Sequence, residues 1–260
     1  MSTETAARRA PAPIEPRLRD RRVSVKREQG RRRLRRIGYV AGVLAVVVLI
    51  VVLLASPLFA ISRVTIRGAT NTGAGDVRSA AQLSGCAIAW CDTDAAVRRI
   101  QRLPWVARAR VDTSWPNRAR VTVTERVATA YITVSPDRRA LVDGDGRVLD
   151  VLTPAPDGPR VELRGIGTVG APGEFLDERG PARVAAALDG PIRDRAVAVD
   201  AASMAVVLDD GTEVRLGDDS DVAVKLAAAN AVLQQLDTTT TYIDVRVPSA
   251  PAVGPARTKK

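Results

Sequence analysis

The sequence contains no histidine, which removes the commonest general base and metal ligand of proteins. A nucleophilic site that pairs serine or cysteine with histidine is therefore impossible. Only two cysteines are present, and two thiols without histidine do not complete a zinc site. Aromatic residues make up 3% of the chain, and none lies in the basic residues 1–36, where stacking on nucleic-acid bases would need them. We therefore expect no catalytic, cofactor or metal residues, no small-molecule substrate and no nucleic acid.

Acidic pairs and one glycine motif are the remaining candidates for chemistry. The pairs Asp143/Asp145 and Asp209/Asp210 lie in expected turns, and the first lacks the full calcium-loop pattern. Residues 165–170 match the Gly-x-Gly-x-x-Gly dinucleotide pattern, but Pro172 and Gly173 follow, where a helix would have to begin. We interpret these segments as turns and a loop.

Residues 37–61 contain no charged side chain. A helix of this length spans roughly 37 Å at about 1.5 Å per residue, more than the ~30 Å of a bilayer core. Residues 1–36 carry 13 of the 39 basic side chains and a net charge of +9, nearly the whole +10 of the chain. This proline-containing leader has little apolar content, so we expect a disordered basic tail at 1–36 before a single transmembrane helix at 37–61.

The charge asymmetry also predicts the orientation. Basic flanks stay in the cytoplasm, so the N-terminus should be cytoplasmic and residues 62–260 extracytoplasmic, as in a single-pass type II protein of the cell membrane. A cleaved signal peptide has a shorter apolar core than this one, so we expect the helix to be retained.

The first outer segment predicts a strand, two helices and two further strands. Residues 63–67 alternate polar and apolar up to Gly68, residues 76–83 are a short helical piece, and a helix capped near Asp92 ends at Pro104. In the strand that follows, we expect Trp105, Ala107, Ala109 and Val111 on one face and Val106 on the other. The Trp115-Pro116 turn then leads into a strand at 119–124. This order implies a sheet with one face covered by two helices.

These residues resemble a known family. Leu103-Pro104-Trp105-Val106, Trp115-Pro116 and Val123-Thr124-Glu125-Arg126 are similar to the polypeptide-transport-associated (POTRA) domain of the bacterial cell-division proteins FtsQ and DivIB. The predominance of arginine over lysine is typical of a GC-rich genome, which fits an actinobacterial member.

The second outer segment is similar to the β-rich domain of that family. We expect hairpins at 140–149 and 206–217, a helix at 180–188 and a helix whose face is Val222, Leu226, Ala229, Leu233 and Leu236. A strand at 242–247 follows. The fold class is α+β, with a POTRA domain at 62–127, an FtsQ-type β domain at 128–248 and a flexible tail at 249–260.

The resemblance implies a non-enzymatic division scaffold at the septum. It would bind FtsB/DivIC-type and FtsL-type proteins outside the membrane and link them to septal peptidoglycan synthesis. In the family the last strand of the β domain accepts a strand from the FtsB-type partner, and the matching residues here are Ile243, Asp244, Val245, Arg246, Val247 and Ser249. An ordinary terminal strand that ends at Pro248 remains the alternative. If it is the docking edge, Val245→Pro should abolish binding.

Cys86 and Cys91 fall between the two helices of the POTRA-like segment. They are either separate thiols or a disulfide in an oxidising compartment, and we favour the disulfide.

Two other classes of function remain open. POTRA domains also occur in envelope transport and assembly factors, which act by strand addition but usually carry several copies before a membrane β-barrel. A membrane-tethered enzyme is the third possibility, and no motif favours it.

Overall fold

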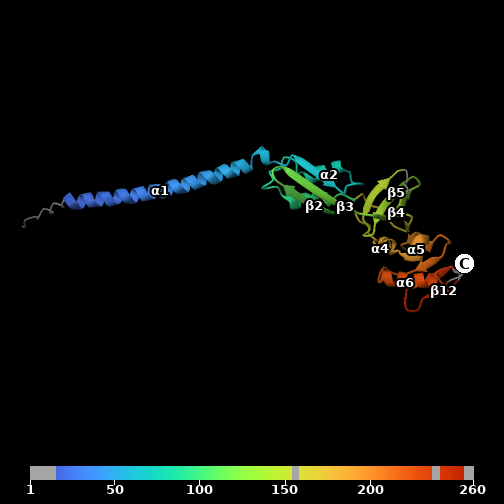
Figure 1. Cartoon of the computed structure of the whole chain (residues 1–260). Coiled ribbons are helices and arrows are strands. Elements are labelled where there is room, and N and C mark those ends of the chain that lie inside the picture. Colours follow the sequence, from blue (N-terminus) through green and yellow to red (C-terminus); the bar gives the residue numbers. More distant parts are fainter. Residues whose placement is uncertain (1–15, 154–157, 236–240, 255–260) are drawn as a thin grey trace, which may run out of the picture. The chain divides into compact units, whose positions relative to one another are not determined.

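The structure is a computed structural model that describes residues 16–153, 158–235 and 241–254, with side chains from Arg35 onward. The chain divides into two units, Met1–Phe59 and Ala60–Lys260. Figure 1 shows the helices and strands of the whole chain.

The first unit is dominated by helix α1, Pro16–Leu54, and ends in the short 3-10 helix η1, Pro57–Phe59. Within the described residues, Arg35–Leu54 is the one helix long and apolar enough to cross a membrane. It ends at Leu54, earlier than the predicted limit at residue 61, because Ser56 and Pro57 interrupt the apolar run. The predicted disordered tail is helical from Pro16 onward, since its Arg, Lys, Glu and Leu residues favour helix and continue an existing one. Residues 1–15 lie outside the described part.

The second unit begins with the predicted β-α-α-β-β order. Its elements are β1 Arg63–Arg67, α2 Ala74–Ala81, α3 Thr93–Ile100, β2 Val106–Ser114 and β3 Arg118–Glu125. The strand order is β1-β3-β2, with β1 parallel to β3 and β2 antiparallel to it. Gly68 ends β1 with φ of +79°, and a Cβ there would lie 2.1 Å from the carbonyl oxygen of Val123, so only glycine fits.

The helices cover one face of this three-stranded sheet. Val77 and Ala81 of α2 and Ala96 and Ile100 of α3 are buried, as are the alternate β3 residues Ala119, Val121 and Val123. The predicted alternation along β2 is wrong at its start. A register shift lies between Val106 and Arg108, and Val106 is buried although we expected it on the face opposite Ala107 and Ala109.

A nine-stranded mixed sheet follows, in the order β12-β11-β10-β9-β8-β7-β4-β5-β6. Its strands are β4 Ala128–Ser135, β5 Arg138–Asp143, β6 Val148–Leu152, β7 Glu162–Arg164, β8 Ala196–Asp200, β9 Ala205–Leu208, β10 Glu213–Arg215, β11 Tyr242–Asp244 and β12 Ala252–Gly254. Both predicted hairpins are confirmed, as β5–β6 and β9–β10.

Three helices pack with this sheet: α4 Gly180–Ala187, α5 Gly190–Arg195 and α6 Val222–Leu233. The core joins strand residues such as Val142 and Val206 to Val184 of α4, Ile192 of α5 and Leu226 of α6. The predicted helices at 180–188 and from Val222 are confirmed, while Leu236 lies outside the described residues.

The C-terminal strand differs from the prediction in two ways. β11 ends at Asp244 rather than at residue 247, and residues 252–254, expected in a flexible tail, form β12. The chain reverses through the proline-containing residues 247–251, where the Ala250 N–H donates to the Val247 carbonyl at 3.0 Å. The reversal brings β12 back antiparallel to β11.

Candidate protein-interaction site

The outer end of the nine-stranded sheet is formed by β12 and not by the predicted edge strand β11. β11 pairs in parallel with β10 on one side and antiparallel with β12 on the other, where Ile243 faces Val253. β12 is the last strand of the order, and Ala252 and Val253 are exposed. Within the described residues, the open row of backbone groups at this end therefore belongs to residues 252–254.

Two of the six predicted docking residues lie in the core. Ile243 and Val245 are fully buried, and the Val245 N–H donates to the Arg215 carbonyl at 3.0 Å. Proline at position 245 would remove this internal hydrogen bond, so Val245→Pro would test folding rather than docking.

Asp244 and Arg246 form an ion pair on the surface beside these core residues. The Arg246 guanidinium donates to the Asp244 carboxylate at 3.0 Å through Nε and 2.7 Å through the terminal nitrogen. These hydrogen bonds lower the pKa of Asp244 below its ordinary value, although partial burial acts the other way. Both charges already have partners within this chain.

The other two predicted residues, Val247 and Ser249, lie in the turn between β11 and β12 and are exposed. The six residues therefore do not share one strand edge. Exposed apolar surface at this end comes from Val247 and from Val253 of β12, residues that are 58% and 46% exposed.

A packing contact around Tyr242, which the sequence pattern does not predict, holds β12 in place. The guanidinium of Arg215 on β10 lies 4.3 Å from the ring centroid of Tyr242 on β11, and Gly254 on β12 lies against the same ring. Thr241 donates its backbone N–H to the Gly254 carbonyl at 3.2 Å. A tyrosine on one short strand and a Val-Gly pair on the next are a weak signal, because nothing in the sequence shows that the chain reverses between them.

Glu125 and Arg126, the last two residues of the Val123-Thr124-Glu125-Arg126 motif, lie where the first sheet passes to the second. The Glu125 carboxylate accepts hydrogen bonds from the backbone N–H groups of Thr70, Asn71 and Thr72 at 2.8–3.0 Å, and so ties the loop after β1 to the end of β3. Partial burial raises the pKa of Glu125, but these backbone hydrogen bonds outweigh it, and the pKa lies below its ordinary value of 4.5.

Arg126 reaches in the other direction, to the turn between β5 and β6. It pairs with Asp143 and, at 3.0 Å, with Asp145. Asp143 also accepts from the backbone N–H groups of Asp145 at 3.0 Å and Arg147 at 2.8 Å, the turn role expected for this carboxylate. Arg147 in turn donates to the carbonyl of Arg102 at 3.0 Å, which ties the same turn to the segment between α3 and β2.

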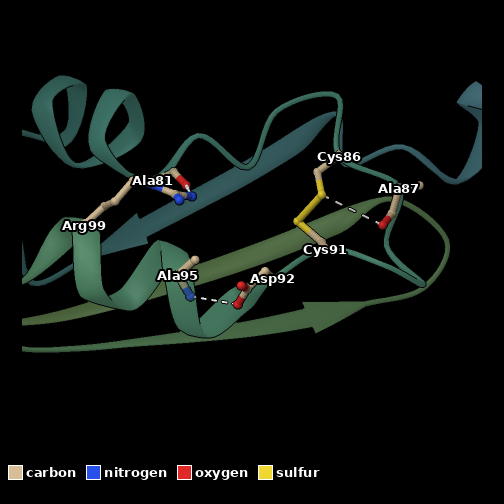
Figure 2. Close-up of a disulfide and its surroundings, with 7 residues drawn as sticks. All are labelled: Ala81, Cys86, Ala87, Cys91, Asp92, Ala95 and Arg99. Atoms are coloured by element: carbon tan, nitrogen blue, oxygen red, sulfur yellow. Dashed lines mark hydrogen bonds between the residues drawn. A yellow bond between two sulfur atoms is a disulfide. The ribbon is translucent and has the colours of Figure 1, made fainter.

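Cys86 and Cys91 form a disulfide with a Cα–Cα distance of 5.6 Å (Figure 2). Asp92 follows directly and caps α3 through the Ala95 N–H at 2.8 Å. Arg99 on the same helix donates to the Ala81 carbonyl at 2.8 Å, at the end of α2. The bond thus closes the loop that leads from α2 into α3.

None of the described residues forms a cluster of three His, Cys, Asp or Glu side chains suited to a metal ion. Residues 165–170, which match the dinucleotide pattern, form a loop without a helix. The acidic pair Asp209/Asp210 binds Arg195.

The architecture defines a class of protein: a membrane-anchored chain with one POTRA domain followed by a β-rich domain. Residues 59–126 match the family model "POTRA domain, FtsQ-type", and residues 130–246 match "Cell division protein FtsQ/DivIB, C-terminal". The chain belongs to the FtsQ/DivIB family of bacterial cell division proteins, whose members are generally non-catalytic.

A curated relative supports the assignment. The chain is 31% identical over 213 residues to "Cell division protein FtsQ" of Mycobacteroides abscessus (strain ATCC 19977). The match covers 76% of this chain and 62% of the relative, so the chain spans less than two thirds of that protein's length. The match to the C-terminal family model ends at residue 246, before β12.

Proposed function

We propose that this chain is a non-enzymatic scaffold of the division machinery, inserted with its N-terminus in the cytoplasm and unit Ala60–Lys260 outside. Its outer part binds FtsB/DivIC-type and FtsL-type proteins at the septum and connects them to septal peptidoglycan synthesis. Family membership supports the division role, and the basic residues before the apolar helix support the orientation. The family matches favour this function over an envelope transport or assembly factor.

The observation that carries the binding mode is the position of β12 at the open end of the nine-stranded sheet. A partner strand can add there in two ways. It can pair with the outer side of β12, or it can displace β12 and pair with β11 through Tyr242–Asp244, which contains part of the edge predicted from the family. β12 is only three residues long, and this short pairing makes displacement a realistic route.

Truncation separates the two routes. The full chain in detergent micelles would be titrated with the extracytoplasmic part of the FtsB-type partner, alongside a chain that ends at Pro251 and a control that ends at Gly254. If the partner pairs with β12, the Pro251 truncation abolishes binding. If the partner replaces β12, the same truncation tightens binding. Equal affinity of all three chains would rule out strand addition at this end of the sheet.

Orientation and localisation are tested in cells. External protease on intact spheroplasts should digest the unit Ala60–Lys260, whereas protection would refute the topology. A fluorescent fusion at the N-terminus should form a band at midcell, and depletion should produce filaments or chains. Uniform envelope fluorescence with normal division would favour the transport or assembly alternative.

A further inference from the structure

Two exposed tryptophans lie in the loops that flank the start of the second unit. Trp90 is 56% exposed and Trp115 is 58% exposed, although tryptophan is usually well buried in a folded domain. Trp90 lies inside the disulfide-closed loop, where its backbone N–H donates to the Ala87 carbonyl at 3.0 Å. Trp115 lies at the tip of the β2–β3 hairpin.

Backbone contacts bring both loops to residues 60–62. Ala60 pairs with Ala87, and Ile61 donates to the Cys86 carbonyl at 2.9 Å. Ser62 donates to the Asn117 carbonyl at 3.0 Å. These anchor points are two residues apart along the chain, roughly 7 Å in an extended backbone. Both tryptophans therefore lie at the end of the unit where the chain enters it.

The same end of the sheet carries two arginines without acidic partners. Arg63 of β1 lies directly opposite Arg118 of β3, and both are exposed on the face of the sheet that the helices leave open. In the described part of the chain neither guanidinium forms an ion pair. Like charges directly opposite on neighbouring strands are unfavourable, so this pair favours an external anion.

The chain itself keeps this end close to a bilayer. Five residues separate Leu54, the end of the membrane helix, from Ala60. An extended chain reaches about 3.3–3.6 Å per residue. Ala60 is therefore tethered within about 20 Å of the point where α1 ends, and Ser62, which holds the second loop, within about 30 Å.

We propose that this end of the unit, formed by Trp90, Trp115, Arg63 and Arg118, docks on the phospholipid surface of the membrane that anchors the chain. Tryptophan rings favour the lipid–water interface, where the apolar ring enters the headgroup region and the N–H meets polar groups. Guanidinium groups bind phosphate oxygens through paired hydrogen bonds. The contact goes beyond the scaffold function, because it would orient the POTRA domain whether or not a partner protein is bound.

The chain contains an internal control for this proposal. Its third tryptophan, Trp105, precedes β2, whereas Trp115 follows the strand. Ten residues of extended chain place them roughly 30 Å apart at about 3.3 Å per residue. Trp105 should therefore remain away from a surface that Trp115 touches.

Contact-dependent quenching tests the proposal. Three variants, each with two Trp→Phe changes, leave Trp90, Trp105 or Trp115 as the single fluorophore in the full chain. Each is reconstituted in vesicles of equal parts phosphatidylglycerol and phosphatidylcholine, with and without bromine on the upper acyl chain. Bromine quenches only at contact, so we expect Trp90 and Trp115 to lose about threefold more emission than Trp105, as residues at a lipid interface should.

Charge is tested by a matched pair of variants in the wild-type tryptophan background. Arg63→Gln/Arg118→Gln should reduce quenching, whereas Arg67→Gln/Arg108→Gln, the same change at the other end of the same face, should not. If Trp90 and Trp115 are quenched no more than Trp105, the proposal is wrong, and this end of the unit faces a protein partner or solvent. Equal strong quenching of all three would also overturn it, because it would mean unspecific insertion. These quenching measurements use no division partner, so their outcome does not depend on whether the proposed scaffold function is correct.

Discussion

Gly254 lies against the ring of Tyr242, and a Cβ built on Gly254 would come within 2.7 Å of the tyrosine hydroxyl oxygen. The two residues face each other across the β11–β12 pair, and Arg215 lies on the same ring. The absence of a side chain at position 254 therefore allows the last strand to approach the sheet.

The first prediction concerns this contact. Gly254→Val should detach β12, because the new side chain would overlap the Tyr242 ring. The Thr241 N–H, which donates to the Gly254 carbonyl, should then exchange with solvent about tenfold faster, the equivalent of ~1.4 kcal/mol. Ala252→Val is the control, because residue 252 is exposed on the same strand. Unchanged exchange in the Gly254 variant would show that β12 does not depend on this packing.

The second prediction concerns Glu125. Glu125→Gln removes the charge and replaces one of two acceptor oxygens by a donor, so the N–H groups of residues 70–72 lose their charged partner. We expect a loss of roughly 2 kcal/mol in the free energy of unfolding, measured by urea denaturation. Glu178→Gln, at an exposed carboxylate of the same unit, should change it little. Equal effects of the two substitutions would contradict the proposed role of the carboxylate.

The pH dependence of the same group forms a third prediction. The pKa of Glu125 is lower in the folded chain than its ordinary value of 4.5. Its contribution to stability is therefore complete above that value and decreases as the pH falls below it, through the lower folded pKa. Urea midpoints measured between neutral pH and acid should fall more steeply for the wild type than for Glu125→Gln. Parallel curves would show that Glu125 does not titrate with folding.

The fourth prediction separates two neighbouring carboxylates. Asp143 has a side chain that is 6% exposed, pairs with Arg126 and accepts two backbone N–H groups, whereas Asp145 is 74% exposed. Asp143→Asn leaves the partly buried Arg126 guanidinium with only the exposed Asp145 as a charge partner, and should cost about 2–3 kcal/mol of unfolding free energy. Asp145→Asn should cost less than about 1 kcal/mol, as surface pairs do. Similar losses for both substitutions would mean that burial does not govern this junction.

Local pattern was sufficient to predict most elements from the sequence. The alternation at residues 63–67 predicts a strand, and the Asp-Gly turns predict hairpins. Both patterns involve residues that are close in the sequence, and the predictions agree with β1 and the two hairpins. The predicted limits of the membrane helix were less accurate. Composition identifies an apolar run, but the last helical residue depends on the Ser56-Pro57 break, and the first depends on helix extending into the charged leader.

The candidate docking edge could not be placed in the same way, because the neighbours of a strand are distant in sequence. The pattern at 242–247 correctly indicates a strand with Ile243 and Val245 inward, yet it carries no information on the return of residues 252–254. Lys225 shows a different limit, because its partner is only seven residues away but lies in a loop that the helix pattern does not describe. It lies on the helix predicted from Val222 and Leu226, but it is buried because its ammonium group binds Asp218 at 2.5 Å and lowers the pKa of that carboxyl.

The last prediction concerns the disulfide between Cys86 and Cys91. Its sequence separation is 5, and the chain-entropy relation gives a stabilisation of roughly 2 kcal/mol for so short a loop. The bond also precedes Asp92, the cap of α3, so reduction should loosen the first turn of that helix. We expect a lower urea midpoint for the wild type in reductant and for Cys86→Ser/Cys91→Ser without it. The double variant should not respond to reductant. Alkylation of both thiols in the unreduced protein would refute the bond, because a disulfide leaves no thiol to react.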